Sequence, residues 1–445
     1  MQTHEMSQIM QEFLHSIGSS ELYDEMPGRW HDMLSGWPDG DGAPFRSESE
    51  LNEVRRQCRE LALTNEFAIN GYENRISYIV GSGYACKIIR RGSDSQSLCD
   101  DVQNIINEFI IRNHWYRRQQ EIVRRMDRDG ESFLRYFEEP GGRIAVRFVE
   151  PSKVRTPQKY TGSPEHSFGI LAAPNDSELI RGYFIEDEFV PSSEIQHRRA
   201  NVDCSTKRGI PLFYPVLKNL QRAEKILRNM SVVASVQSAI AIIRKHTGGN
   251  AASVRQFVQN EADVTRSDLN GRPYSYKRYA PGTILDATSG IEYEFPASSI
   301  DASSYVAILQ AELRAVASRL VMPEFMLTSD ASNANYSSTM VAEGPSVRNF
   351  QRLQRDMVEM DTEVFHRVIR SAVYAQVLPE DVLSRVSILC IPPNLAVRDR
   401  LSEARADEIL LRCGVLSPQT MALRHGLDPE NELENISKKQ NSSIK

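Results

Sequence analysis

The chain has 445 residues, of which 40% are hydrophobic and 25% are charged, and its formal net charge is −6. This is the usage of an ordinary globular protein of two to four domains, or of one multi-part fold, and it excludes a chain that is disordered throughout. The acidic excess excludes a protein that wraps nucleic acid over its whole surface, because neutralising phosphates requires an excess of Lys and Arg.

The cysteines are scattered and form no C-x-x-C pair, which argues against a zinc site and against a disulfide framework. They are Cys58, Cys86, Cys99, Cys204, Cys390 and Cys413. We expect reduced thiols in a protein made in the cytoplasm. No secretory signal is visible in residues 1–14, and the most apolar stretch, 232–243, is well below the roughly 20 residues that span a bilayer.

The N-terminal part of the chain is predicted to be mostly helical. A short helix is expected at 5–17, and a second helix begins at a cap around Ser47 and reaches about Asn70. A short strand is predicted at 76–80, followed by a turn at Gly81-Ser82-Gly83 that lacks the pattern of a phosphate-binding loop. Residues 100–126 then predict one long helix with regularly spaced apolar residues.

The next segment has the composition of a small β-rich module. Short runs of β-branched and aromatic residues at 133–137, 144–149 and 181–185 are separated by Gly and Pro, and the module ends near Cys204. Residues 216–246 then contain no Gly or Pro for 31 residues. One helix of that length would be roughly 46 Å long, and its narrow apolar stripe would have to pack within the chain or in an oligomer.

The C-terminal half alternates β-forming and helical segments. Residues 247–298 are rich in Gly, Asn and Asp, with candidate strands at 274–279, 282–285 and 291–295. A second long helix is predicted at 301–321. A polar loop is expected at 328–338 and a third long helix at 346–377. After Pro379 the chain is predicted to be helical again, so the fold class is α+β and mostly helical.

No familiar catalytic motif is present, and we expect neither an enzyme nor a bound cofactor or metal. Asp127, Asp129 and Glu131 form the densest acid cluster near a glycine. They suit a metal-dependent nuclease, which is the alternative hypothesis, although a solvated charged turn is favoured. His197, beside two arginines, either contacts a phosphate or lies in a surface loop, and the loop is favoured.

An ordered series of short motifs is more informative than any single residue. The upstream members are Arg128-Asp129-Gly130-Glu131, Glu150-Pro151-x-x-Val154-Arg155-Thr156-Pro157 and Arg208-Gly209-Ile210-Pro211-Leu212-Phe213. The downstream members are Pro281-Gly282-Thr283-Ile284, Glu292-Tyr293-Glu294-Phe295-Pro296, Ala317-Ser318-Arg319-Leu320-Val321-Met322-Pro323 and Asn335-Tyr336-Ser337-Ser338. Over about residues 50–435 this series resembles the lambda-type tailed-phage portal protein family.

The resemblance implies an elongated portal fold with wing, stem, clip and crown, assembled as a ring at one capsid vertex. The ring is normally a dodecamer of one protein, and double-stranded DNA passes through it during packaging and ejection. The implied partners are the terminase large subunit, a head-completion or adaptor protein, and the major capsid or scaffold protein, with no membrane. The implied location is the virion, after assembly in the host cytoplasm.

The resemblance also assigns each segment a place in the portal. The expected boundaries are 1–208 for the wing, 209–246 for the first stem helix, 247–298 for the clip, 299–326 for the second stem helix, 327–342 for the tunnel loop, 343–392 for the wing helix, and 393–445 for the crown and C-terminal tail.

Three sets of residues are the candidate contacts of such a ring. The tunnel loop has one acid and no base, so it can touch DNA without clamping it; its residues are Ser329, Asp330, Asn333, Asn335, Tyr336, Ser337 and Ser338. Bases near one face of the first stem helix form positive belts around DNA or bridges between subunits; they are Lys218, Arg222, Lys225 and Arg228. Clip bases either meet an acidic partner or DNA, or form a solvated strand face; they are Arg272, Lys277 and Arg278.

Overall fold

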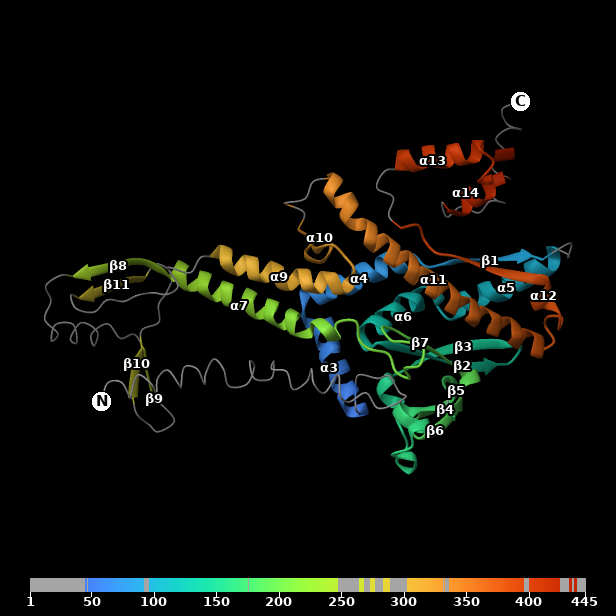
Figure 1. The fold of residues 1–445 in the computed structure, drawn as a ribbon, viewed down its shortest axis with the longest axis horizontal. Coiled ribbons are helices and arrows are strands. Elements are labelled where there is room, and N and C mark those ends of the chain that lie inside the picture. The colour runs from blue at the N-terminus through green and yellow to red at the C-terminus, as the bar shows by residue number, and fades with distance from the viewer. Residues whose placement is uncertain are drawn as a thin grey trace. The chain divides into compact units, whose positions relative to one another are not determined.

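The computed structural model describes most of the chain in two compact units (Figure 1). The described residues are 45, 47–91, 96–174, 176–246, 264–267, 273–276, 283–288, 302–330, 332, 336–395, 400–424, 432–433 and 436–437. Unit 1 contains 1–64, 72–214 and 347–445, and unit 2 contains 65–71 and 215–346. The described elements are mostly helices with several small sheets, so the predicted α+β class is confirmed. The helix expected at 5–17 lies outside the described residues.

The N-terminal helices of the described chain are α3 (Glu48–Thr64) and α4 (Glu66–Ile79). Ser47 caps α3 as predicted, since its Oγ accepts a hydrogen bond from the Glu50 N–H at 3.2 Å. Asn65 caps α4, because its Oδ1 accepts from the Ala68 N–H at 3.0 Å. The strand expected at 76–80 is wrong. These residues end α4, and the buried Tyr72, Ile76 and Ile79 recur at helical spacing.

A strand follows the glycine turn and pairs with a distant strand. Gly81 and Gly83 have φ values of +53° and +104°, which confirms the predicted turn. β1 (Ala85–Arg90) then runs antiparallel to β12 (Val386–Ile391), which follows the short helix α12 (Val382–Arg385). The helical structure expected after Pro379 is therefore wrong for Val386–Ile391, because these residues form a strand whose partner lies far away in the sequence.

The helix predicted at 100–126 is two helices, α5 (Gln96–Arg112) and α6 (Trp115–Asp129). The break lies at Asn113 and at His114, whose φ is +49°. Asn113 donates from Nδ2 to the Ile144 oxygen at 3.0 Å and accepts from the Val146 N–H at 2.9 Å. These bonds tie the interhelical residue to a strand, so a tertiary contact fixes the break.

The predicted β-rich module is confirmed as two three-stranded antiparallel sheets. One sheet has the order β3-β2-β7, with β2 (Glu131–Glu139), β3 (Arg143–Val149) and β7 (Ile195–Arg199). The other has the order β4-β5-β6, with β4 (Ile170–Ala173), β5 (Asp176–Ile185) and β6 (Glu188–Pro191). Their common apolar cluster consists of Phe133, Val154, Ile170, Tyr183, Ile185, Val190 and Ile195.

The described residues of unit 2 form helices and two short pairs of strands. α7 (Leu217–Ala239) ends early, and the single helix expected over 216–246 is wrong for its last part, which is the strand β8 (Ile240–His246). Ile240, Ile242 and Ile243 are β-branched and favour a strand, and β8 pairs in parallel with β11 (Thr283–Thr288).

The other strands of unit 2 agree with the predicted β-rich segment. β9 (Val264–Ser267) pairs antiparallel with β10 (Pro273–Tyr276). The candidate strand at 291–295 lies outside the described residues. The chain continues with α9 (Ala302–Leu320) and α10 (Glu324–Thr328), which lie on either side of Pro323.

The longest helix, α11 (Tyr336–Tyr374), begins ten residues earlier than predicted and contains Pro345. Residues 336–346 belong to unit 2 and 347–374 to unit 1. Within unit 1, Phe365 packs its ring against Trp115 and Phe109, with centroids 6.3 Å and 6.1 Å away. The described C-terminal helices are α13 (Arg400–Arg412) and α14 (Pro418–Arg424). Among the described helices, none combines the length and apolar character that crossing a bilayer requires.

Candidate functional site

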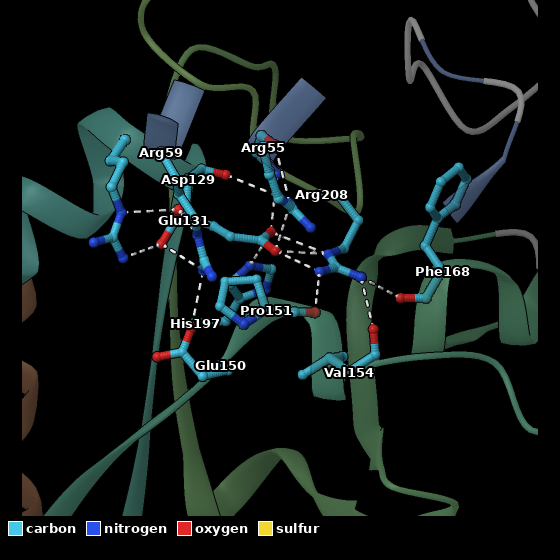
Figure 2. Close-up of polar contacts among 12 residues, drawn as sticks. Arg55, Arg59, Asp129, Glu131, Glu150, Pro151, Val154, Phe168, His197 and Arg208 are labelled. Atoms are coloured by element: carbon cyan, nitrogen blue, oxygen red, sulfur yellow. Dashed lines mark hydrogen bonds and ion pairs between the residues drawn. The ribbon is translucent and has the colours of Figure 1, made fainter. Parts of the chain in front are cut away.

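The acid cluster predicted at the end of α6 lies inside unit 1, where three sequence motifs meet (Figure 2). Glu131 begins β2, Pro151 and Val154 follow β3, and Arg208 and Gly209 precede α7. Glu131 has no exposed side-chain surface. The motifs around these residues therefore share one structural role: they build a buried ion network.

Glu131 is the centre of this network and accepts from several nitrogen donors. The guanidinium of Arg208 binds its carboxylate through Nε at 2.8 Å and Nη2 at 2.6 Å, and Arg55 donates from Nη2 at 2.7 Å. His197 Nε2 lies 3.0 Å from Oε2, and the Gly209 N–H donates to the same oxygen at 3.0 Å.

Arg208 also joins Glu131 to neighbouring loops. Its Nη1 donates to the carbonyl oxygens of Val154 and Phe168 at 3.0 and 2.9 Å, and Nη2 donates to that of Pro151 at 2.9 Å. One buried side chain therefore ties the loop after β3, the loop before β4 and the entry to α7 to the first residue of β2 (Figure 2).

The charges of this network follow from its geometry. Burial alone would raise the pKa of Glu131, but the Arg208 and Arg55 guanidinium groups outweigh it and hold that pKa well below its usual value. Burial lowers the pKa of His197 to about 4, in spite of the neighbouring carboxylate. At neutral pH the imidazole is therefore uncharged and donates its Nε2–H to Glu131, since an ionised carboxylate can only accept.

The other two acids of the cluster are also paired with arginines. Asp127 receives two hydrogen bonds from Arg75, at 2.8 and 2.9 Å. Asp129 receives two from Arg59, at 2.7 and 3.0 Å, and two from Arg128, at 3.1 and 2.7 Å.

The structure does not support the alternative hypothesis of a metal-dependent nuclease, and the expectation of a solvated charged turn is wrong. Asp127, Asp129 and Glu131 are buried, and guanidinium groups occupy the directions that a metal would need. Within the described ranges, no group of three or more His, Cys, Asp or Glu is arranged to hold a metal ion.

Gly130 and Gly209 allow two backbone segments beside the network to pass very close to each other. A Cβ on Gly209 would lie 1.9 Å from the Gly130 carbonyl oxygen, and a Cβ on Gly130 would lie 2.4 Å from the Ile210 carbonyl carbon. Gly130 also has a φ of +84°, which favours glycine. The glycines in the Arg-Asp-Gly-Glu and Arg-Gly-Ile-Pro motifs are thus explained by close packing.

Both hypotheses for His197 are wrong, because the residue lies in β7 with its side chain buried. Its neighbour Arg198 is also buried and forms an ion pair with Asp361 of α11 at 2.8 Å. Trp115 and Gln119 of α6 donate to the same carboxylate at 3.2 and 2.6 Å. This second network fixes α6 and β7 to α11. Sequence reasoning missed it because its members are distant in the chain.

The predicted stem bases lie on α7, which packs beside α9 (Figure 1). Each helix has a buried apolar face, formed by Leu217, Leu220, Ala223, Leu313, Val316, Ala317 and Leu320. Arg222 binds Glu312 of α9 at 2.9 Å, and Asn219 donates to the same carboxylate at 2.7 Å. Arg222 therefore links the two helices within one chain.

The remaining stem bases face the outside of α7. Lys218, Lys225 and Arg228 are exposed, and Arg228 forms an ion pair with Glu224 one turn earlier at 2.9 Å. Their roles as a belt around DNA or as bridges between subunits stay a prediction.

The expected tunnel loop is shorter than predicted. Ser329 ends α10 with a φ of +58°, and the exposed Asp330 accepts from the Ser332 N–H at 2.9 Å. This contact with Ser332 lowers the pKa of Asp330. Tyr336, Ser337 and Ser338 are not in a loop but form the first turn of α11.

Five candidate residues lie outside the described part of the chain. They are Asn333 and Asn335 of the tunnel loop and Arg272, Lys277 and Arg278 of the clip.

The described networks hold chain segments together. In the comparison with protein families, the model described as "Phage portal protein, lambda family" matches residues 32–354, well over half of the chain. The chain belongs to the lambda family of phage portal proteins, and its function is that of a portal protein. A search of the curated proteins found no match.

The chain is also similar to chains of three solved structures. The virion of a native gene transfer agent (GTA) particle contains a chain that is 15% identical, with a TM-score of 0.42, covering 90% of this chain and 99% of that one. The neck of a native GTA particle computed with C12 symmetry has 15% identity, a TM-score of 0.40, and coverage of 91% and 99%. An HK97 family phage portal protein from Corynebacterium diphtheriae has 12% identity, a TM-score of 0.30, and coverage of 64% and 83%.

Proposed function

We propose that copies of this chain form a closed ring at one vertex of a phage capsid and conduct double-stranded DNA during packaging and ejection. The match of the portal family model to residues 32–354 carries this proposal. The ring is a dodecamer in the virion, after assembly in the host cytoplasm. Its role is structural, because the sequence has no phosphate-binding loop and any movement of DNA needs a motor supplied by a partner.

The element order supports an assignment of segments to the parts of a portal. The first stem helix (209–246) contains α7, and the second (299–326) contains α9. The clip (247–298) contains β9 to β11. The wing (1–208 and 343–392) contains the β-rich module and most of α11, and the crown (393–445) contains α13 and α14. The tunnel loop (327–342) reduces to the short connection between α10 and α11, at about 329–335.

The outer faces of the helix pair support contacts between copies. Val232 of α7 is 56% exposed, and Val306 and Ile308 of α9 are 40% and 52% exposed. Large apolar side chains on helices that already bury their other face favour association with a neighbour. Head-to-tail contacts of this kind close into a ring when the rotation between copies divides a full turn evenly and has no rise along the axis.

The proposed partners follow from the assigned parts. The clip would dock the terminase large subunit during packaging and the head-completion or adaptor protein afterwards. The wing would contact the major capsid or scaffold protein. DNA would pass the polar connection around Ser329 and Asp330, which has no base to hold a phosphate.

Negative-stain electron microscopy with native mass spectrometry tests the proposal. We expect rings with a central hole and a mass near twelve times the 50.5 kDa of one chain. A chain that remains monomeric at high concentration, and also in the presence of its scaffold protein, would contradict the ring.

A further inference from the structure

Two cysteines that are far apart in the sequence face each other across the β1–β12 pair. Cys86 and Cys390 are direct partners in the antiparallel register. Their Sγ atoms lie 3.8 Å apart, and both residues are free thiols. The tertiary structure thus brings together two thiols that are 304 positions apart.

The pair occupies a position without backbone hydrogen bonds between the strands. The Ile88 N–H donates to Gln103 Oε1 at 2.9 Å, and the Cys86 carbonyl accepts from Gln103 Nε2 at 3.1 Å. These groups of β1 therefore point towards α5 and away from β12. At such non-hydrogen-bonded positions the Cα atoms are about 4.5 Å apart, which lies within the range that a disulfide spans.

The surroundings of the pair allow thiol chemistry. Cys86 is half-buried, whereas Cys390 is buried and contacts the Thr362 hydroxyl at 3.8 Å. The hydrogen-bond contact between the two thiols lowers the pKa of Cys390, whereas the same contact and burial raise the pKa of Cys86, so Cys390 is the thiol that ionises first. A lowered pKa increases the fraction of thiolate, which is the form that attacks a disulfide.

We infer that Cys86 and Cys390 form a reversible redox site that small disulfides such as oxidised glutathione convert into a cross-strand disulfide. One protein thiolate attacks a glutathione sulfur, forms a mixed disulfide and releases one glutathione thiolate. The second protein thiolate attacks the protein sulfur of that mixed disulfide and releases the second glutathione. The two protein thiols lose two electrons and two protons, and glutathione disulfide is reduced to two thiols.

The disulfide would fasten the strand that precedes the C-terminal helices to the N-terminal part of unit 1. β12 ends at Ile391, and α13 begins at Arg400. An oxidised chain keeps β12 on β1 even when other contacts open. This inference goes beyond the portal function and does not depend on it.

Thiol mapping on the full chain tests the inference. The exposed Cys204 and Cys413 are first replaced by Ser, so that they form no bonds between chains. The folded protein is incubated with oxidised glutathione, alkylated and digested with trypsin. We expect the peptides 76–87 and 386–398 to be joined by a bond that dithiothreitol reverses, and the thermal midpoint to rise on oxidation.

A variant that lacks one of the two thiols serves as the control. In the same background, Cys390→Ala should give no linked peptides and no oxidation-dependent rise of the thermal midpoint. The inference is overturned if both thiols are alkylated after oxidation of the folded chain. Two other results would also overturn it. One is a glutathione adduct that stays on Cys86 as the final product, and the other is a Cys86–Cys390 disulfide that forms only in denaturant.

Discussion

Glu131 shows how residues that suggest catalysis can instead hold a fold together. Its carboxylate is fully buried between Arg55 and Arg208 and is the shared counter-charge of both guanidinium groups. Closely spaced acids beside a glycine were visible in the sequence. Their arginine partners come from positions 76 residues earlier and 77 later, so local spacing gave no sign of them.

The replacement Glu131→Gln tests this structural role. It leaves two buried guanidinium groups without a counter-charge, and we expect the free energy of unfolding to fall by about 3–5 kcal/mol. Urea denaturation measures the change. The control is Glu53→Gln, which removes an exposed pair with Arg56 and should change stability little. Equal effects of the two substitutions would contradict the role of the buried network.

His197 makes stability depend on pH. The folded chain holds its pKa at about 4, below the usual 6.5, so between these values the unfolded chain binds a proton that the folded chain does not. The stability contributed by neutral His197 is therefore complete above pH 6.5 and is lost as the pH falls towards 4. At pH 5 the loss amounts to about 2 kcal/mol of the free energy of unfolding. The lowered pKa values of Asp129 and Glu150 add further losses at lower pH.

The variant His197→Gln isolates this effect, because glutamine keeps an N–H donor for Glu131 but does not titrate. Urea denaturation of both proteins from neutral pH to about pH 4 measures the slopes. We expect the variant to lose less stability over this interval than the wild type. Parallel profiles would show that His197 is not the titrating group.

At the scale of elements, turns were easier to predict than the ends of helices. The turn at Gly81 and the cap at Ser47 depend on neighbouring residues alone, and both are observed. The break at Asn113 and the end of α7 depend on contacts with strands that lie later in the chain. Helical periodicity continued through both positions, so the sequence predicted longer helices than the structure contains.

The β2–β3 hairpin offers an element-scale prediction. Gly141 and Gly142 both have positive φ, but their surroundings differ. A Cβ on Gly142 would lie 2.8 Å from the Ala375 side chain and from the Ser371 carbonyl oxygen, at the C-terminal end of α11. A Cβ on Gly141 would meet no atom within 4 Å. Gly141→Ala should cost only backbone strain, about 1–2 kcal/mol. Gly142→Ala should cost about 1–3 kcal/mol more, because the hairpin must move from α11. Thermal or urea unfolding of both variants measures the difference. Equal losses would mean that the contact is not tight.

At the scale of the whole molecule, the exposed apolar residues of α7 and α9 point to assembly. A single chain has nothing to gain from Val232 or Ile308 in water, whereas a neighbouring copy could bury both. The ion pair of Arg222 with Glu312 joins the two helices within one chain. Because Arg222 is already paired within the chain, the exposed Lys218 is a better candidate than Arg222 for contacts outside the chain.

The replacement Ile308→Asp tests this surface. We expect the native mass to shift from rings towards monomers, because the new carboxylate would be buried without a partner between copies. The circular dichroism spectrum should stay that of the wild type, since the substitution lies on an exposed position. Ala307→Asp, at the adjacent exposed position, adds the same charge without removing a large apolar side chain. It should disturb the ring less. Intact rings in Ile308→Asp would place the contact between copies elsewhere.

The sequence by itself determined the family, the class of fold, and the local signals of caps, turns and the β-rich module, because these depend on residue types at short and fixed spacing. The tertiary structure decided the pairing of β1 with β12, the arginines around Glu131 and the contact of Cys86 with Cys390. These partners are separated by 76 to 306 residues. Their meeting depends on the path of the whole chain and on the burial of charge, and neither can be read from neighbouring residues.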